Sequence, residues 1–335
     1  MKPFRAMRAR IGTYKKRRPH DSFKLTRRRD YSRSLELPGV MAFTAGVNKT
    51  IWKNRKVFIP LAIVYALLSG TLIGIGSQDT YTTLTDTLSE TGSEIFKGNL
   101  GQIGQAGLLF VSVAGSGLSG TPTESQQIYT VILALLIWLT TVWLLRTILA
   151  GHRAKMRDGL YNAGSPIIAT FLVSLLFLIQ LVPIAIATIG YSAAASSGLL
   201  NGGVAALLFW VAAVLLGIMS LYWVTSTFFA LIIVTLPGMY PAQAVRTAGD
   251  MVTGRRLRIL LRLLWMMLCV VVTWIIVMIP LILLDGGIKS LWPNLEGVPV
   301  IPVVLLLMGV TSFIWVASYV YLLYRKVVDD DAKPA

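Results

Sequence analysis

The sequence has few of the residues that build disulfide frameworks and metal sites. Its 335 residues include one cysteine, Cys269, and two histidines, His20 and His152, which lie far apart. A single cysteine cannot close a disulfide within the chain, and so few sulfur and imidazole ligands argue against a Cys/His zinc site. The patterns H-E-x-x-H and G-x-S-x-G are also absent, as is a close pair of carboxylates within an apolar run. We therefore expect a protein that is not an enzyme and that uses no cofactor or metal.

Charge is scarce as well. Only 14% of the residues are charged, 55% are hydrophobic, and the mean hydropathy is +0.69. A soluble domain carries about 25% charged residues, so lipid is the expected solvent for most of this chain. None of the long apolar runs has a charged residue or a histidine near its centre. Because coupled transporters use buried ionisable groups, this lack argues against proton- or ion-coupled transport and leaves uncoupled transport open.

Six apolar runs are long enough to cross a hydrocarbon core of about 30 Å. They extend over Val57 to Ile75, Ile128 to Leu149, Ile167 to Ile189, Val204 to Leu236, Ile259 to Leu284 and Val300 to Leu323. The sequence therefore predicts an all-α, polytopic membrane protein with six transmembrane helices. An even number of spans places both termini on one side of the membrane.

The distribution of cations predicts which side that is. Of the 31 Lys and Arg residues, 29 fall in or beside the segments before span one, between spans two and three, between spans four and five, and after span six. Only Lys97 and Lys289 fall on the opposite side. Because Lys-rich and Arg-rich connections stay in the cytoplasm, both termini are expected to be cytoplasmic. The expected location is the bacterial cytoplasmic (inner) membrane.

The chain is expected to have four parts. Residues 1–37 form a basic, disordered cytoplasmic tail, 38–56 an interfacial amphipathic helix, 57–325 the six-span domain, and 326–335 a short cytoplasmic tail. The candidate contacts to phosphate or lipid headgroups, in the first tail and before span five, are Lys15, Lys16, Arg17, Arg18, Arg27, Arg28, Arg29, Arg255, Arg256 and Arg258. Basic clusters bind phosphates of anionic inner-leaflet lipids or of RNA, so the partner of the first tail is either the lipid bilayer or a ribosome or other cytoplasmic partner.

Three basic segments precede the odd-numbered spans. They cover Pro38 to Lys56, Gly151 to Ser165 and Pro241 to Arg258. The first carries apolar residues at helical spacing and ends in Lys and Arg, which is typical of a helix lying in the membrane interface. We expect an amphipathic elbow helix before each of spans one, three and five.

Span one carries small residues on one helix face. Ala62, Ala66, Gly70 and Gly74 recur at intervals of four, and such a face lets another helix approach closely. The neighbour is either a span of the same chain or a second copy in a homo-oligomer.

Gln180, with Pro183 close by, is the most polar position in the middle of a span. Gln180 either forms an interhelical hydrogen bond beside a proline kink or contacts a substrate in a groove.

The outer connection, residues 76–127, is long and weakly acidic. Gly115, Gly117 and Gly120 match the dinucleotide pattern G-x-G-x-x-G, but Thr121-Pro122 follows at once where that site needs a helix. The segment is re-entrant, interfacial or disordered.

The segment before span five has a recognisable sequence. It reads Val234-Thr-Leu-Pro-Gly, then Ala244-Val-Arg-Thr-Ala248, Met251-Val252 and Gly254-Arg255-Arg256. This resembles the six-span membrane domain that is fused to some bacterial glycerophosphodiester phosphodiesterases and that occurs in related uncharacterised stand-alone bacterial membrane proteins. The chain has Ala248 where that pattern has a serine. The resemblance implies the membrane fold and a loose association with lipid, without the phosphodiesterase activity.

These features favour a non-enzymatic scaffold or recruitment protein whose basic tail engages anionic lipid or a cytoplasmic partner. The alternative is an uncoupled permease or a lipid-handling transporter.

Overall fold

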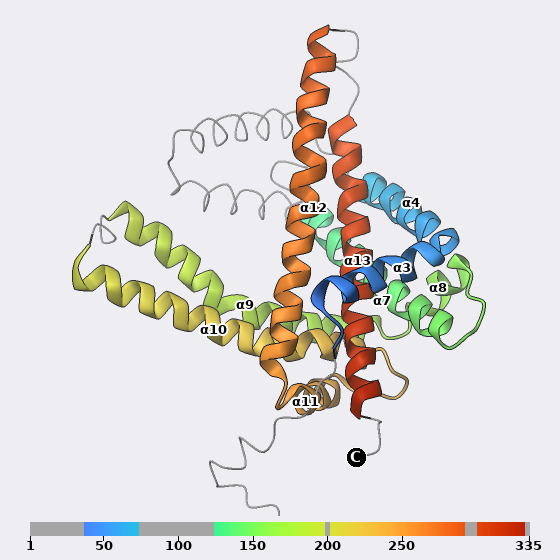
Figure 1. The fold of residues 1–335 in the computed structure, drawn as a ribbon, viewed down its shortest axis with the longest axis horizontal. Helices are drawn as coiled ribbons and strands as arrows, with labels where there is room; N and C mark the ends of the chain where they lie inside the picture. The colour runs from blue at the N-terminus through green and yellow to red at the C-terminus, as the bar shows by residue number, and fades with distance from the viewer. Residues whose placement is uncertain (1–36, 74–123, 198–201, 292–299, 332–335) are drawn as a thin grey trace, which may run out of the picture.

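The computed structural model describes residues 37–73, 124–197, 202–291 and 300–331. Nine helices make up this described part of the chain (Figure 1). The predicted tail clusters and almost all of the outer connection 76–127 lie outside the described residues.

Six of the described helices are long and apolar enough to cross a membrane. They are α4 (Arg55–Leu72), α7 (Glu124–Leu149), α9 (Ile167–Ser196), α10 (Gly203–Ile233), α12 (Arg256–Leu291) and α13 (Val300–Asp331). This confirms the prediction of an all-helical chain with six candidate membrane spans.

Three shorter helices each precede one of the long helices α4, α9 and α12. They are α3 (Val40–Lys53), α8 (Met156–Asn162) and α11 (Pro241–Val252). The chain is thus helical in all three basic segments, while the position of these helices at a membrane surface and the cytoplasmic side of the termini stay predictions.

Helix α11 follows directly from its sequence. Proline at its first position has the φ angle that a helix start needs. Ala244, Ala248 and Val252 recur every four residues and are fully buried on one face. Gly254 then adopts a φ of +84°, a conformation that glycine takes without steric cost, and the chain turns into α12.

Helix α13 is the central element. It contacts α3, α4, α7, α10 and α12, and its buried residues Ala317, Val320, Leu323 and Val327 belong to the main hydrophobic core. In Figure 1 it runs beside α12, α4 lies to the right of this pair, and α7 passes behind α13.

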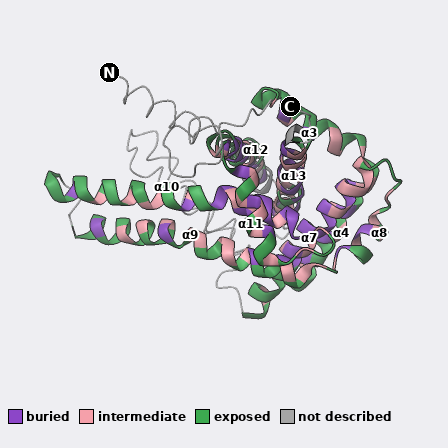
Figure 2. Ribbon diagram, turned by 90° about the horizontal axis from the view of Figure 1, so that it is seen from below, coloured by how far each residue is buried: buried purple, intermediate pink, exposed green. Residues whose placement is uncertain are grey.

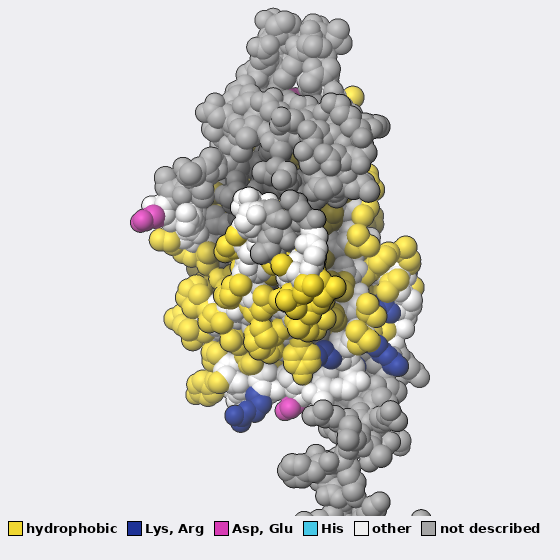
Figure 3. Space-filling view, turned by 90° about the vertical axis from the view of Figure 1, so that its left-hand side faces the viewer, with side chains coloured by type: hydrophobic (Ala, Val, Ile, Leu, Met, Phe, Trp, Pro, Cys, Tyr) yellow, Lys and Arg dark blue, Asp and Glu magenta, His cyan; other side chains and the backbone are white. Residues whose placement is uncertain are grey.

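Helices α9 and α10 form a hairpin that projects to one side of the α12–α13 pair (Figures 1 and 2). The two helices pack along each other, and the end near α11 also contacts α7, α12 and α13. Large apolar side chains such as Leu178 and Leu215 are exposed along the hairpin. In the view toward its tip, hydrophobic side chains cover much of the described surface, and Lys and Arg lie along the lower edge (Figure 3).

Candidate membrane-contact and lipid-binding sites

The three arginines predicted to contact headgroups have different surroundings at the junction of α11 and α12. Arg255 is only 3% exposed and therefore lies inside the junction. Arg256 is half-buried because its guanidinium stacks 3.7 Å from the ring centroid of Tyr222 and donates to the Tyr222 carbonyl at 3.0 Å. Arg258 is exposed. The predicted contacts from Lys15 to Arg18 and from Arg27 to Arg29 lie outside the described residues.

A fourth arginine joins α12 to the start of α3. Arg262 is buried, donates a hydrogen bond to the carbonyl of Pro38, and lies 5.8 Å from the ring centroid of Phe43. The indole N–H of Trp265, one turn further along α12, donates to the Thr44 hydroxyl at 3.1 Å. This edge of α3 is therefore fixed to α12 by polar and cation–π contacts.

Helix α13 holds the same short helix from another side. The indole N–H of Trp315 donates to the side-chain oxygen of Asn48 at 2.7 Å. The ring of Phe43 packs edge-on against Tyr319 with a centroid separation of 4.9 Å. Together these contacts attach α3 to two of the long helices.

The small-residue face of α4 packs within the chain. Ala66 is 7% exposed, Ala62 and Gly70 are half-buried, and Gly74 lies outside the described residues. Helix α4 contacts both α7 and α13. The neighbouring Tyr65 is fully buried, and its hydroxyl is 2.7 Å from the Thr140 hydroxyl of α7. The face thus has partners in its own chain.

Gln180 lies at the contact between α9 and α10. Its side-chain oxygen accepts a hydrogen bond from the Thr227 hydroxyl at 2.6 Å, and its carbonyl accepts one from Ser220 at 2.7 Å. Pro183, three residues on, is buried inside α9. Because proline removes a helical N–H and displaces nearby carbonyls, hydroxyls of a neighbouring helix commonly supply donors there. The structure therefore gives Gln180 the interhelical bond that the sequence allowed.

A polar cavity of about 530 Å³ lies where α7 and the start of α9 meet the segment between α10 and α11. Its polar lining comes from Arg146, Asn162, Ser165, Thr235 and Tyr240. The Arg146 guanidinium donates to the Thr235 carbonyl at 3.1 Å and to the Thr235 hydroxyl at 2.5 Å. The sequence identified Arg146 only as a cation at the end of a span. It did not indicate this site, because Thr235, the partner of Arg146, is 89 residues away in the sequence.

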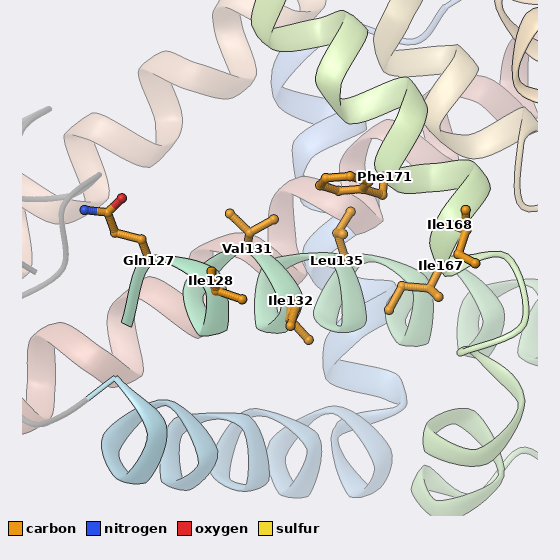
Figure 4. Close-up of a pocket in the computed structure, with 8 residues that line it drawn as sticks. All are labelled: Gln127, Ile128, Val131, Ile132, Leu135, Ile167, Ile168 and Phe171. Atoms are coloured by element: carbon orange, nitrogen blue, oxygen red, sulfur yellow. The ribbon is translucent and has the colours of Figure 1, made fainter. Parts of the chain in front are cut away.

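An apolar groove, also of about 530 Å³, lies between α7 and α9. Figure 4 shows Val131 and Leu135 of α7 pointing toward Phe171 of α9, with Ile167 and Ile168 at the start of that helix. The lining is almost entirely aliphatic and aromatic, so the groove suits a hydrocarbon chain.

The described residues contain no group of three or more His, Cys, Asp and Glu side chains that could hold a metal ion. Helix number, length and composition define the class of the protein, which is a multi-pass membrane protein. No family model, curated protein or solved structure matches the chain.

Proposed function

We propose that this protein is a non-enzymatic, multi-pass protein of the bacterial cytoplasmic (inner) membrane that scaffolds or recruits a partner. In this proposal both termini are cytoplasmic. The basic tail, residues 1–37, and the arginines near α11 engage anionic lipid headgroups or a cytoplasmic partner such as the ribosome.

The observation that carries the proposal is the clustering of cations at one end of α12. Arg246 and Arg258 are exposed there, and Arg256 is held beside them by Tyr222. In Figure 3, Lys and Arg side chains border the hydrophobic surface along its lower edge. A cationic border of this kind suits anionic headgroups, which attract each nearby Lys or Arg by about 1 kcal/mol.

The test compares the full chain with a chain lacking residues 1–37, both in nanodiscs of neutral lipid. Binding to anionic vesicles and to purified ribosomes is measured as salt is raised. We expect the full chain to bind at least one of them with an affinity that falls steeply with salt, because phosphate contacts release counterions, and we expect truncation to abolish that binding.

A matched control keeps the tail length and replaces only its two clusters, Lys15 to Arg18 and Arg27 to Arg29, with glutamine. It should behave like the truncated chain. Binding that is independent of salt or that survives both changes would contradict recruitment through the tail.

An uncoupled permease or lipid-handling transporter is the second candidate, and the apolar groove between α7 and α9 favours it.

The test of this second candidate is the flux of a fluorescent phospholipid in proteoliposomes. Gln180→Leu and Thr227→Val remove the same interhelical bond, but only the first also removes the amide. Flux lost in Gln180→Leu and kept in Thr227→Val would support a substrate contact. Equal flux in both variants, or none in the unmodified protein, would contradict it.

A further inference from the structure

One face of α7 lines both the polar cavity and the apolar groove. Leu139, Trp143 and Arg146 line the cavity, and Val131 and Leu135 line the groove. These five residues follow one another at intervals of three or four, so they lie on a single helix face. The cavity and the groove therefore adjoin along α7, with Leu135 and Leu139 one turn apart.

The cavity suits an anion because its cation is fixed and not neutralised by a carboxylate. Two hydrogen bonds to Thr235 hold the Arg146 guanidinium in place. Among the described residues, no carboxylate forms an ion pair with it. A guanidinium has five N–H donors, so donors remain for the oxygens of a phosphate.

The first turn of α9 adds further donors to the same cavity. Pro166 and Ala169 line it, and the helix start has no side-chain cap. Pro166 has no N–H, and the Ile167 N–H already donates to the Gly164 carbonyl at 3.2 Å. The N–H groups of Ile168 and Ala169 are therefore the donors that remain in this turn. The first N–H groups of a helix carry partial positive charge, which favours an anion. Ser165 brings a hydroxyl to this position.

The groove indicates which kind of phosphate compound would occupy the cavity. Ile167, Ile168 and Phe171 of α9 line the groove, while Pro166 and Ala169 from the same stretch line the cavity. A ligand that fills both must join an anionic group to a hydrocarbon chain. Soluble phosphate esters would leave the apolar groove empty, whereas a phospholipid has both parts covalently linked.

We propose that α7, α9 and the segment between α10 and α11 hold one anionic phospholipid. Its phosphate lies against Arg146 and the start of α9, and one acyl chain lies in the groove between α7 and α9. This site is separate from the basic tail and from the arginines of α11 and α12, so it does not depend on recruitment.

The test uses native mass spectrometry of the full chain purified in mild detergent and titrated with phosphatidylglycerol. We expect one phosphatidylglycerol to bind tightly. Arg146→Gln should weaken this binding by about tenfold or more, because a hydrogen bond to a charged group is lost. Arg157→Gln removes an exposed cation of α8 outside the cavity and should leave the bound lipid in place. Equal binding by all three proteins would overturn the proposal.

A second variant tests the acyl groove and separates lipid from free phosphate. Val131→Trp fills the groove and should weaken phosphatidylglycerol binding without touching Arg146. Glycerol phosphate should compete poorly, since it has no acyl chain. If glycerol phosphate displaces the lipid at equal concentration and Val131→Trp has no effect, the site binds free phosphate esters and the proposal is wrong. Circular dichroism and gel filtration check that each variant is folded.

Discussion

At the scale of single residues, polar side chains inside the protein join helices to one another. The Trp138 indole donates to the Leu231 carbonyl at 3.1 Å and so joins α7 to α10. The Trp274 indole donates to the Ser312 hydroxyl at 2.9 Å and joins α12 to α13. An unpaired polar group in hydrocarbon costs several kcal/mol, so such bonds restrict which helix faces can meet.

Tyr65→Phe tests one of these bonds. The variant removes the hydroxyl that pairs with Thr140 at 2.7 Å and keeps the buried ring. We expect a loss of about 1 kcal/mol in the free energy of unfolding, because interhelical hydrogen bonds in membranes average roughly 0.6 and reach about 1.7 kcal/mol. SDS titration in mixed micelles measures the change.

Thr140→Val supplies the control through a double-mutant cycle. If the two hydroxyls stabilise the protein through each other, the double variant should lose less than the sum of the single variants. Strict additivity would show that the bond contributes nothing.

Polar residues also show what sequence reasoning can predict about a site. Gln180 could be recognised because it is the most polar residue in the middle of a span, and its two roles could be stated. Thr227, its partner, could not be chosen, because several hydroxyls of α10 lie within the same apolar run. Arg146 was recognised as a cation, but the sequence did not show that it lines a cavity. A cavity forms only when segments that are distant in the sequence meet in the fold.

At the scale of elements, helices extend past the apolar runs that predicted them. Helix α13 continues to Asp331, beyond the predicted end at Leu323, and α9 continues to Ser196, beyond Ile189. Hydropathy marks where lipid should end, whereas a helix ends where its backbone hydrogen bonds stop. Helix α10 instead ends early, at Ile233, because the chain turns before Gly238, which has a φ of +76°.

Gly159→Ala tests how α8 packs on α7. A Cβ at Gly159 would lie 2.8 Å from the Cγ of Leu144, which is fully buried, so the added methyl group forces the two helices apart. Overpacking of this kind costs about 1–3 kcal/mol. We expect that loss in the free energy of unfolding, measured by SDS titration.

Gly164→Ala is the matched control for this substitution. Nothing lies within 4 Å of a Cβ built at Gly164, five residues further along the same connection. Its effect should stay within about 0.5 kcal/mol, as for most surface substitutions. Equal stability of the two variants would contradict the close contact between α8 and α7.

At the scale of the whole molecule, the arrangement of the helices could not be predicted although their number could. Helices α9 and α10 are apolar on nearly every side, and no face of their sequences indicates a neighbour. The sideways projection of their hairpin produces no hydrophobic periodicity in the sequence. The central position of α13 produces none either. Residues that lie far apart in the sequence decide both.

Spin labels on the hairpin test whether lipid surrounds it. Leu178→Cys and Leu215→Cys, in a Cys269→Ser background, place labels at exposed positions on α9 and α10. We expect the labels to collide more often with oxygen, which concentrates in lipid, than with a water-soluble nickel complex. Lys53→Cys, at the exposed end of α3, should show the opposite preference. Labels on the hairpin that favour nickel would mean that it lies in water.

The predicted topology has its own test in intact cells. Ser119→Cys, in the same Cys269→Ser background, places a thiol in the predicted outer connection. A membrane-impermeant maleimide added outside should label it, since 29 of the 31 Lys and Arg residues are assigned to the other side. Labelling only after the cells are opened would contradict cytoplasmic termini.

The central position of α13 has a consequence for biosynthesis. Of the described helices, α13 is the last to leave the ribosome, yet α3, α4, α7, α10 and α12 all contact it. Asn48 of α3 is synthesised more than 260 residues before its partner Trp315. At synthesis rates of about 5–20 residues per second, the earlier helices wait many seconds in the membrane without their shared partner. During that interval the helix faces that later pack on α13 lack this partner, so the main hydrophobic core is completed only when α13 arrives.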